Sequence, residues 1–336
     1  MLLSFLFALS AFASVAFTNP LPLPEISIQS IKRSEAGPEI SGANFPDPAI
    51  IKVGSTWYAF ATRTIGSSIH IQVASSPDFT TWNIINKSDG TQFDALPNLP
   101  AWVDASNPAT WAPDVNQMLD GTFVMYYSAT AKADPSKHCV GAAKSSTVTG
   151  PYTPIGSAAF ICPLSQGGAI DASGYYVGGK RYVTWKIDGN SLGHGGACSN
   201  MVAPIVTTPI MVQQVGNDGV SFIGAAKKIM DNDGVDDQGV VEAPSLVKIG
   251  STWVLFFSSG CFVSTYNQTY ATASSIMGPY TRATKPLFYN GVDGLTNPGG
   301  GDIQPDGTHL VFHANAPSGR AMFQATVSLN GRAITA

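Results

Sequence analysis

Five carboxylates stand at the head of five similar stretches of this sequence. They are Asp47, Asp114, Asp171, Glu242 and Asp302. Each acid precedes a short apolar run, a glycine-containing turn and a second run rich in aromatic and branched residues. Paired carboxyl groups suit hydrolysis of a glycosidic bond, where one protonates the leaving oxygen and the other activates water or attacks directly. Crowding them in one pocket would also raise the pKa of one and keep it protonated.

The neighbours of these acids suggest their roles. Glu242 is the only glutamate among the five, and its extra methylene gives it the reach of a general acid. Asp47 is fixed between two prolines, which suits a rigid general base. We interpret Asp47, Asp171 and Glu242 together as a catalytic set. An acid before a strand can instead cap a turn, and we favour that interpretation for Asp114 and Asp302, with Asp114 tying its unit to a neighbour.

The spacing of the acids predicts the fold that must position them. They recur at steps of 67, 57, 71 and 60 residues, and such a period indicates a repeat architecture. The first unit contains four predicted strands, at 50–53, 57–61, 68–74 and 81–85. A Gly-Pro-Tyr-Thr turn follows the third strand of the second unit and returns in the fourth unit. The sequence therefore predicts an all-β fold, a five-bladed β-propeller whose innermost strands bring the acids to one rim of a central channel.

Aromatic residues near this rim are candidates for stacking on sugar rings. Phe45 and Trp111 flank two of the acids, so we expect both to be pocket walls that bind substrate. Trp57 and Trp185 lie within the aromatic runs, and we expect them to be core residues between blades.

Composition excludes some partners. The chain has 336 residues, of which 44% are hydrophobic, so a large core is available. Only 12% are charged, the net charge is −4, and no basic cluster larger than a pair occurs. A nucleic-acid partner is therefore not expected, because it would require a basic stripe.

The first residues predict secretion. Met1 to Phe17 carries no charged side chain and is too short to span a bilayer, where about 20 residues are needed. We predict a signal peptide at 1–16, with an apolar N-terminal strand as the alternative. Residues 17–40 are predicted as a pro-segment or linker, in which Lys32-Arg33 is either a cleavage site or an ordinary charged pair. The propeller is predicted over 41–336, with no membrane partner.

Cysteines and sequons agree with an extracellular, monomeric glycoprotein. The four cysteines predict two disulfides, with three pairings open; they are Cys139, Cys162, Cys198 and Cys261. Asn86 and Asn267 begin glycosylation sequons.

Four motifs make the chain resemble glycoside hydrolase family 43 over roughly residues 40 to 330. The motifs are Phe-Pro-Asp-Pro at 45–48, Trp-Ala-Pro-Asp-Val at 111–115, Ala-Ile-Asp at 169–171 and Glu-Ala-Pro at 242–244. The resemblance implies a five-bladed propeller that hydrolyses arabinofuranosides or xylosides with inversion. It implies Asp47 as general base, Glu242 as general acid and Asp171 as the carboxylate that tunes and orients the acid. Inversion implies that the two working carboxyls stand about 6.5–9.5 Å apart.

The resemblance also implies an ion site. Many members hold calcium in the central channel near a histidine of the last blade, and His313 matches that position as a metal ligand and pocket residue. The alternative is a histidine bound only to water. The stretch 297–302 departs from the family pattern, since many relatives carry a Gly-His pair there. No cofactor is expected for the chemistry itself.

These observations predict a secreted inverting glycoside hydrolase. We expect it to act on arabinose-containing plant cell-wall polysaccharide or oligosaccharide, as an α-L-arabinofuranosidase or arabinanase. The alternatives are a β-xylosidase of the same family and a non-catalytic sugar-binding propeller. A retaining levan- or sucrose-processing propeller is disfavoured, because Pro46 stands where such enzymes carry asparagine. Exo or endo action is left open.

Overall fold

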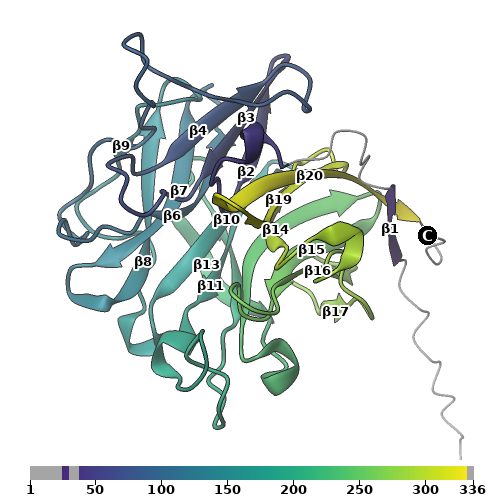
Figure 1. Cartoon of the computed structure of the whole chain (residues 1–336). Helices are drawn as coiled ribbons and strands as arrows, with labels where there is room; N and C mark the ends of the chain where they lie inside the picture. Colours follow the sequence, from purple (N-terminus) through teal and green to yellow (C-terminus); the bar gives the residue numbers. More distant parts are fainter. Residues whose placement is uncertain (1–24, 30–37, 331–336) are drawn as a thin grey trace, which may run out of the picture.

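The computed structural model describes residues 25–29 and 38–330 of the chain. Within these ranges the chain forms five four-stranded antiparallel sheets that radiate from a common centre (Figure 1). The predicted all-β, five-bladed propeller is therefore confirmed. The predicted signal peptide at 1–16 and the Lys32-Arg33 pair lie outside the described residues.

The first four blades each consist of consecutive strands, with the innermost strand first. Blade 1 comprises β2 (Ala49–Val53), β3 (Thr56–Ala61), β4 (Gln72–Ser76) and β5 (Asn83–Ile84). Blade 2 comprises β6 (Trp111–Gln117), β7 (Phe123–Ala131), β8 (Asp134–Ser145) and β9 (Thr153–Pro154). Blade 3 comprises β10 (Ala169–Val177), β11 (Lys180–Ile187), β12 (Ile210–Val215) and β13 (Phe222–Met230). Blade 4 comprises β14 (Val241–Ile249), β15 (Thr252–Ser259), β16 (Asn267–Ala273) and β17 (Thr281–Arg282).

Blade 5 joins the two ends of the described chain. It comprises β18 (Gly299–Ile303), β19 (His309–Ala316), β20 (Gly319–Asn330) and β1 (Glu25–Gln29). Strand β1 pairs antiparallel with β20 as the outermost strand of the sheet (Figure 1). This strand lies within the range 17–40 that was predicted as a pro-segment or linker. Their sequence Glu-Ile-Ser-Ile-Gln alternates polar and apolar residues, which is the pattern of a strand.

The innermost strands form a closed ring around the channel. Strands β2, β6, β10, β14 and β18 contact one another in that order, and β18 contacts β2 again. The helical elements of the described residues are short 3-10 turns, at Ile40–Gly42, Leu164–Gln166, Gly189–Leu192, Gly234–Asp237 and Val292–Gly294. Residues far apart in sequence therefore meet at the channel.

The core lies between neighbouring blades. Phe60 of blade 1 packs in one cluster with Tyr127 of blade 2, and Phe256 of blade 4 shares another with Phe312 of blade 5. Fully burying one such side chain contributes about 1.5–3 kcal/mol. Trp57 and Trp185 are also buried, so their predicted place in the core is confirmed. The hairpin glycines Gly54 and Gly250 have a φ of 61°, a left-handed conformation that favours glycine.

Two disulfides support the connections between blades. Cys139–Cys162 ties β8 to the segment that leads into blade 3. Cys198–Cys261 joins the loop after β11 in blade 3 to the loop after β15 in blade 4. The expected pair of disulfides is therefore confirmed and its pairing resolved. Among the described residues, no helix has both the length and the apolar character needed to cross a bilayer.

Candidate active site

A left-handed residue marks the top of every innermost strand. These residues are Asp47 (φ 51°), Ala112 (38°), Asp171 (57°), Ala243 (52°) and Gly300 (61°). In the last four blades the strand pairing shifts register at this point, as it does at a β-bulge. Bulges of this kind re-aim side chains and are frequent beside active sites.

The five acids do not occupy equivalent positions relative to these left-handed residues. Asp47 and Asp171 are themselves left-handed residues, whereas Glu242 lies one residue before that position. Asp114 and Asp302 lie two residues after it. Since side chains alternate along a strand and change direction at a bulge, these three positions present their carboxyl groups differently.

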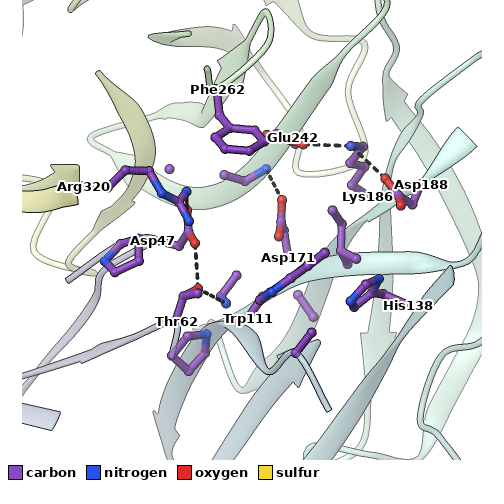
Figure 2. A pocket seen from close by; sticks show the side chains of 18 of the residues that line it. Asp47, Thr62, Trp111, His138, Asp171, Lys186, Asp188, Glu242, Phe262 and Arg320 are labelled. Atoms are coloured by element: carbon purple, nitrogen blue, oxygen red, sulfur yellow. Dashed lines mark hydrogen bonds and ion pairs between the residues drawn. The ribbon is translucent and has the colours of Figure 1, made fainter. Parts of the chain in front are cut away.

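A cavity of about 790 Å³ opens at this end of the channel and is lined by residues of all five blades. Asp47, Asp171 and Glu242 all line it, so the structure brings together the three residues predicted as a catalytic set. Figure 2 shows their side chains converging from three different blades. Arg320 and Lys186 add two positive charges to the same cavity.

Asp47 is surrounded by groups that favour its ionised form. Its Oδ2 accepts a hydrogen bond from Thr62 Oγ1 at 2.6 Å, and its Oδ1 accepts one from Arg320 Nη1 at 2.9 Å (Figure 2). Burial opposes ionisation, but the charge of Arg320 and the hydrogen bond from Thr62 outweigh it and hold the pKa of Asp47 well below its usual range. Asp47 is therefore ionised near neutral pH.

Asp171 and Glu242 form a coupled pair on the other side of the cavity. Burial, together with the adjacent Glu242, raises the pKa of Asp171 well above its usual range. Asp171 Oδ2 accepts a hydrogen bond from the Ala243 backbone N–H at 3.0 Å. Glu242 Oε2 accepts one from Lys186 Nζ at 2.7 Å, and Lys186 Nζ also binds Asp188 Oδ1 at 3.0 Å (Figure 2). Two adjacent carboxyl groups in this setting hold a proton more strongly than isolated ones.

Asp114 and Asp302 hold blades together through hydrogen bonds to other blades, as predicted for Asp114, whereas a turn cap would use the backbone of the same turn. Asp302 Oδ2 accepts a hydrogen bond from the Ile50 backbone N–H at 2.9 Å, and its Oδ1 accepts one from Ser245 Oγ at 2.6 Å. Asp114 Oδ1 accepts one from the Gly174 backbone N–H at 3.3 Å. Burial raises the pKa of both carboxyls, to about 8 for Asp114, where Asp302 adds repulsion, and to about 6 for Asp302.

Of the two aromatic residues predicted to form walls of the pocket, Trp111 lines the cavity and Phe45 does not. Trp111 lines the cavity, and its ring stacks on that of His138 with 3.6 Å between centroids. Burial lowers the pKa of His138 to about 4, so this stacked pair is neutral near pH 7. Phe45 is fully buried in the core against blade 5 and does not line the cavity, so its prediction as a substrate-binding wall is wrong. In a regular strand Phe45 and Asp47 would face the same side, but the left-handed backbone at Asp47 interrupts that alternation.

His313 lies behind the cavity. It is fully buried on β19, so its prediction as a substrate-binding residue is wrong. Burial and the charge of Arg320 lower its pKa, and the neutral ring accepts a hydrogen bond at Nδ1 from the Asp47 backbone N–H, at 3.1 Å. This bond places the ring proton on Nε2.

The donor atoms around His313 bear on its predicted role as a metal ligand. Its buried Nε2 has no hydrogen-bond partner among the described residues. Calcium takes about six to eight oxygen ligands. The described residues contain no cluster of three or more His, Cys, Asp or Glu side chains that could hold a metal. The residues do not fit a calcium cage built by the protein, and no step of the chemistry is assigned to a metal.

Sequence reasoning missed several residues of the cavity. Lys186 and Asp188 follow directly on the aromatic run of blade 3, and a lysine inside a buried run is a signal that could have identified them. Arg320 and Phe262 come from hairpin and loop segments whose local sequence carries no such signal. Phe262 lies at the cavity with the Arg320 guanidinium 5.2 Å from its ring centre.

The site therefore contains one ionised carboxylate, Asp47, and a second carboxyl group, Asp171, whose pKa is raised by burial and by the adjacent Glu242. A carboxylate can remove a proton from water, and a protonated carboxyl can donate one to a leaving oxygen. This arrangement can hydrolyse an acetal such as a glycosidic bond.

Comparison with known proteins agrees with this chemistry. Residues 39–333 match the family model described as glycosyl hydrolases family 43. The chain is 37% identical over 113 residues to the extracellular endo-alpha-(1->5)-L-arabinanase of Thermotoga petrophila, a match over 32% of this chain and only 22% of that relative. It is 28% identical over 282 residues to the extracellular endo-alpha-(1->5)-L-arabinanase 1 of Bacillus subtilis, over 80% of this chain and 79% of that one.

A solved structure confirms the shared fold. The GH43 endo-arabinanase from Bacillus licheniformis matches with a TM-score of 0.62 at 22% identity, over 86% of this chain and 96% of that chain.

Proposed function

The chain belongs to glycosyl hydrolases family 43 and is a glycoside hydrolase, and from that premise we propose that it hydrolyses arabinose-containing plant cell-wall polysaccharide with inversion. The observation that carries this proposal is the convergence of Asp47, Asp171 and Glu242 on one cavity, with opposite electrostatic surroundings at its two sides. The non-catalytic sugar-binding alternative is set aside, because the chain is an enzyme of this family.

In the proposed mechanism, Asp47 is the general base. It removes a proton from a water molecule, whose oxygen attacks the anomeric carbon from the face opposite the leaving group. Glu242 donates its proton to the glycosidic oxygen as that bond breaks, so the product sugar has the inverted configuration. Asp171 raises the proton affinity of the pair and orients the acid. The ion pair with Arg320 supports the role of Asp47, because a base must be unprotonated at the working pH.

Arabinan is the favoured substrate, as an arabinanase or α-L-arabinofuranosidase. Support comes from the two relatives above, whose names describe arabinanases. A β-xylosidase remains the second candidate, because the same carboxylate set serves both sugars and the loops at the cavity mouth select between them.

We also propose that the enzyme is secreted and acts as a monomer. The two disulfides support an oxidising compartment. Both arabinanase relatives are named extracellular.

The direct test is a substrate panel. Purified protein is assayed on aryl α-L-arabinofuranoside, aryl β-D-xyloside, linear arabinan and arabinoxylan, alongside Asp47→Ala and Glu242→Ala. Asp120→Ala, at an exposed turn outside the cavity, is the matched control. We expect arabinose or arabino-oligosaccharide release that falls by at least about 100-fold in both cavity variants and is unchanged in the control. Xylose release alone would establish the second candidate, and full activity in either cavity variant would refute the assignment of that residue.

A further inference from the structure

Hydrogen bonds join neighbouring blades at the cavity rim. In four of the five blade junctions, the left-handed residue of an innermost strand donates its backbone N–H to a side chain of the preceding blade. The four bonds are Ala112 N to Thr62 Oγ1 at 2.8 Å, Asp171 N to Ser128 Oγ at 3.0 Å, Gly300 N to Ser258 Oγ at 2.8 Å and Asp47 N to His313 Nδ1 at 3.1 Å. We call these bonds the inter-blade ring. All four acceptors occupy the same place in their blades, on or directly after the second strand and opposite the residue that precedes the left-handed residue.

The ring is broken at one junction, between blades 3 and 4. The corresponding place in blade 3 is occupied by Lys186, which pairs with Ile170 on β10. A lysine ammonium carries three donors and no acceptor, so it cannot receive the N–H of Ala243. That N–H is accepted by Asp171 Oδ2 instead, at 3.0 Å. At this junction Asp171 therefore accepts the backbone N–H that, in the other four junctions, is accepted by the side chain equivalent to Lys186.

Lys186 is thereby free to bind the next blade in another way. Its Nζ donates to Glu242 Oε2 at 2.7 Å and to Asp188 Oδ1 at 3.0 Å (Figure 2). The lysine is fully buried, and only 1% of its side chain is exposed. A buried charge is costly unless it is paired, and the other blades fill this place with a hydroxyl or an imidazole that costs less. The inter-blade ring does not require a lysine at this position, but the lysine forms an ion pair with Glu242.

We propose that Lys186 is a positioning residue for Glu242, a role that rests on the proposed function of Glu242 as general acid. Lys186 holds the Oε2 atom, which leaves Oε1 to carry the proton towards the glycosidic oxygen. Once that proton has moved to the leaving oxygen, the ammonium stabilises the carboxylate that remains. Asp188 receives a second hydrogen bond from the ammonium and fixes its direction.

The charges around Glu242 give this role a signature in the pH profile. The titratable groups that interact with Glu242 are Lys186, Asp171, Tyr266 and His313, and Asp188 binds the same lysine ammonium. Among them Lys186 alone is a cation near neutral pH, and it favours the ionised form of Glu242. Loss of this ammonium should therefore move the basic limb of the kcat/KM profile to higher pH, and loss of the negative charge of Asp188 should move it to lower pH.

The test compares Lys186→Met, Asp188→Asn and Glu242→Ala on two aryl glycosides of the sugar that the enzyme accepts. The phenyl glycoside needs protonation of its leaving group, and the dinitrophenyl glycoside does not. We expect Lys186→Met to lose at least about 10-fold more kcat/KM on the phenyl than on the dinitrophenyl substrate, a fraction of the general-acid effect. The basic limb of its profile moves to higher pH, and that of Asp188→Asn moves to lower pH.

Ser258→Ala is the matched control. It removes an acceptor of the inter-blade ring at the equivalent place and does not line the cavity. We expect it to lower the melting temperature without changing the leaving-group dependence or the basic limb. Equal losses on both substrates in Lys186→Met, with an unmoved basic limb, would reduce Lys186 to a structural residue.

Two further outcomes keep the inference testable. If Lys186→Met fails to fold, an unmoved basic limb in Asp188→Asn overturns the proposal by itself. If Glu242→Ala shows no leaving-group dependence, the proposed role of Glu242 fails, and this outcome is distinct from a failure of Lys186 alone.

Discussion

Single residues decide which carboxyl group in the cavity carries a proton. Asp47 faces Arg320 and Thr62, while Asp171 faces Glu242 across a short gap in a buried setting. Opposite surroundings push the pKa values of acids apart, which is how one cavity holds a base and an acid at the same pH.

Removal of the Arg320 charge tests whether this residue keeps Asp47, the proposed general base, ionised. Without it, burial is less well opposed, so the pKa of Asp47 rises. Because the base must be ionised, Arg320→Gln should move the acidic limb of the kcat/KM profile to higher pH. Loss of a hydrogen bond to a charged group, about 1.5–3 kcal/mol, corresponds to about 10- to 100-fold in kcat/KM. Arg320→Lys keeps the charge and should keep the limb near its original pH. An acidic limb unchanged in Arg320→Gln would contradict the assignment of Asp47 as the ionised base.

Asp114 and Asp302 make a prediction about stability rather than catalysis. Their folded-state pKa values are raised, so the native state binds more protons than the unfolded state, and stability is lost as pH rises from about 4 to about 8. Asp114→Asn keeps an oxygen for the Gly174 N–H and removes the charge. We expect its urea midpoint to fall less than that of the wild type between these pH values, by the equivalent of at least about 1 kcal/mol. Parallel pH dependences in the two proteins would show that Asp114 carries no excess proton affinity.

At the scale of residues, the sequence identified which residues belong to the site more reliably than it predicted where their side chains point. Asp47, Asp171 and Glu242 were identifiable because acids at the head of repeated strands must converge in a propeller. The bulges were not identifiable, since the left-handed conformation of Asp171 or Ala243 depends on tertiary contacts. For that reason Phe45 was assigned to the cavity although it points into the core. Lys186 and Arg320 were missed because their partners come from other blades.

At the scale of elements, the cavity mouth is shaped by two loops that a disulfide connects. Cys198 belongs to the loop after β11, and Cys261 belongs to the loop after β15. Ser199 and Phe262, the residues next to these cysteines, both line the cavity. The disulfide therefore fixes the part of the wall that blades 3 and 4 contribute.

A double variant, Cys198→Ser with Cys261→Ser, should loosen this wall. We expect KM to rise more than kcat falls, because the loops bear on substrate contact and the catalytic carboxyls lie on strands. The free energy of unfolding should fall by about 2–5 kcal/mol. Cys139→Ser with Cys162→Ser is the control, with a similar loss of stability. If the two pairs change KM equally, the Cys198–Cys261 bond has no particular role at the cavity mouth.

Many of the strands could be predicted from the sequence, because the repeated units show the same pattern of apolar and aromatic runs. The aromatic run at 57–61 carries its period in the sequence and lies in β3, whereas the run predicted as a strand at 68–74 becomes a strand only from Gln72, in β4. Strand β1 was missed because it is a single short strand, separated from its partner β20 by nearly the whole chain.

At the scale of the whole molecule, the propeller is closed by pairing the two ends of the described chain. Strand β1 covers β20, which would otherwise present a row of unpaired backbone groups to solvent. Closure in this way makes blade 5 depend on residues that precede blade 1.

Removal of β1 tests the closure. A protein that begins after residue 29 should melt at least about 2–4 °C lower than one that begins after residue 24, which corresponds to about 1 kcal/mol for a chain of this class. The longer protein keeps residues 25–29 and serves as the control. Differential scanning calorimetry on both proteins gives the comparison, and identical melting temperatures would mean that β1 adds nothing to closure.

The measurement that tests the central claim most directly is the configuration of the first product. Proton NMR during hydrolysis of an aryl α-L-arabinofuranoside distinguishes the anomer released by the enzyme from the one formed later by mutarotation. If Asp47 activates water while Glu242 protonates the leaving oxygen, the first arabinose observed has the β configuration. Initial release of α-arabinose would mean that a carboxylate attacks the sugar itself, and would contradict the account of this cavity.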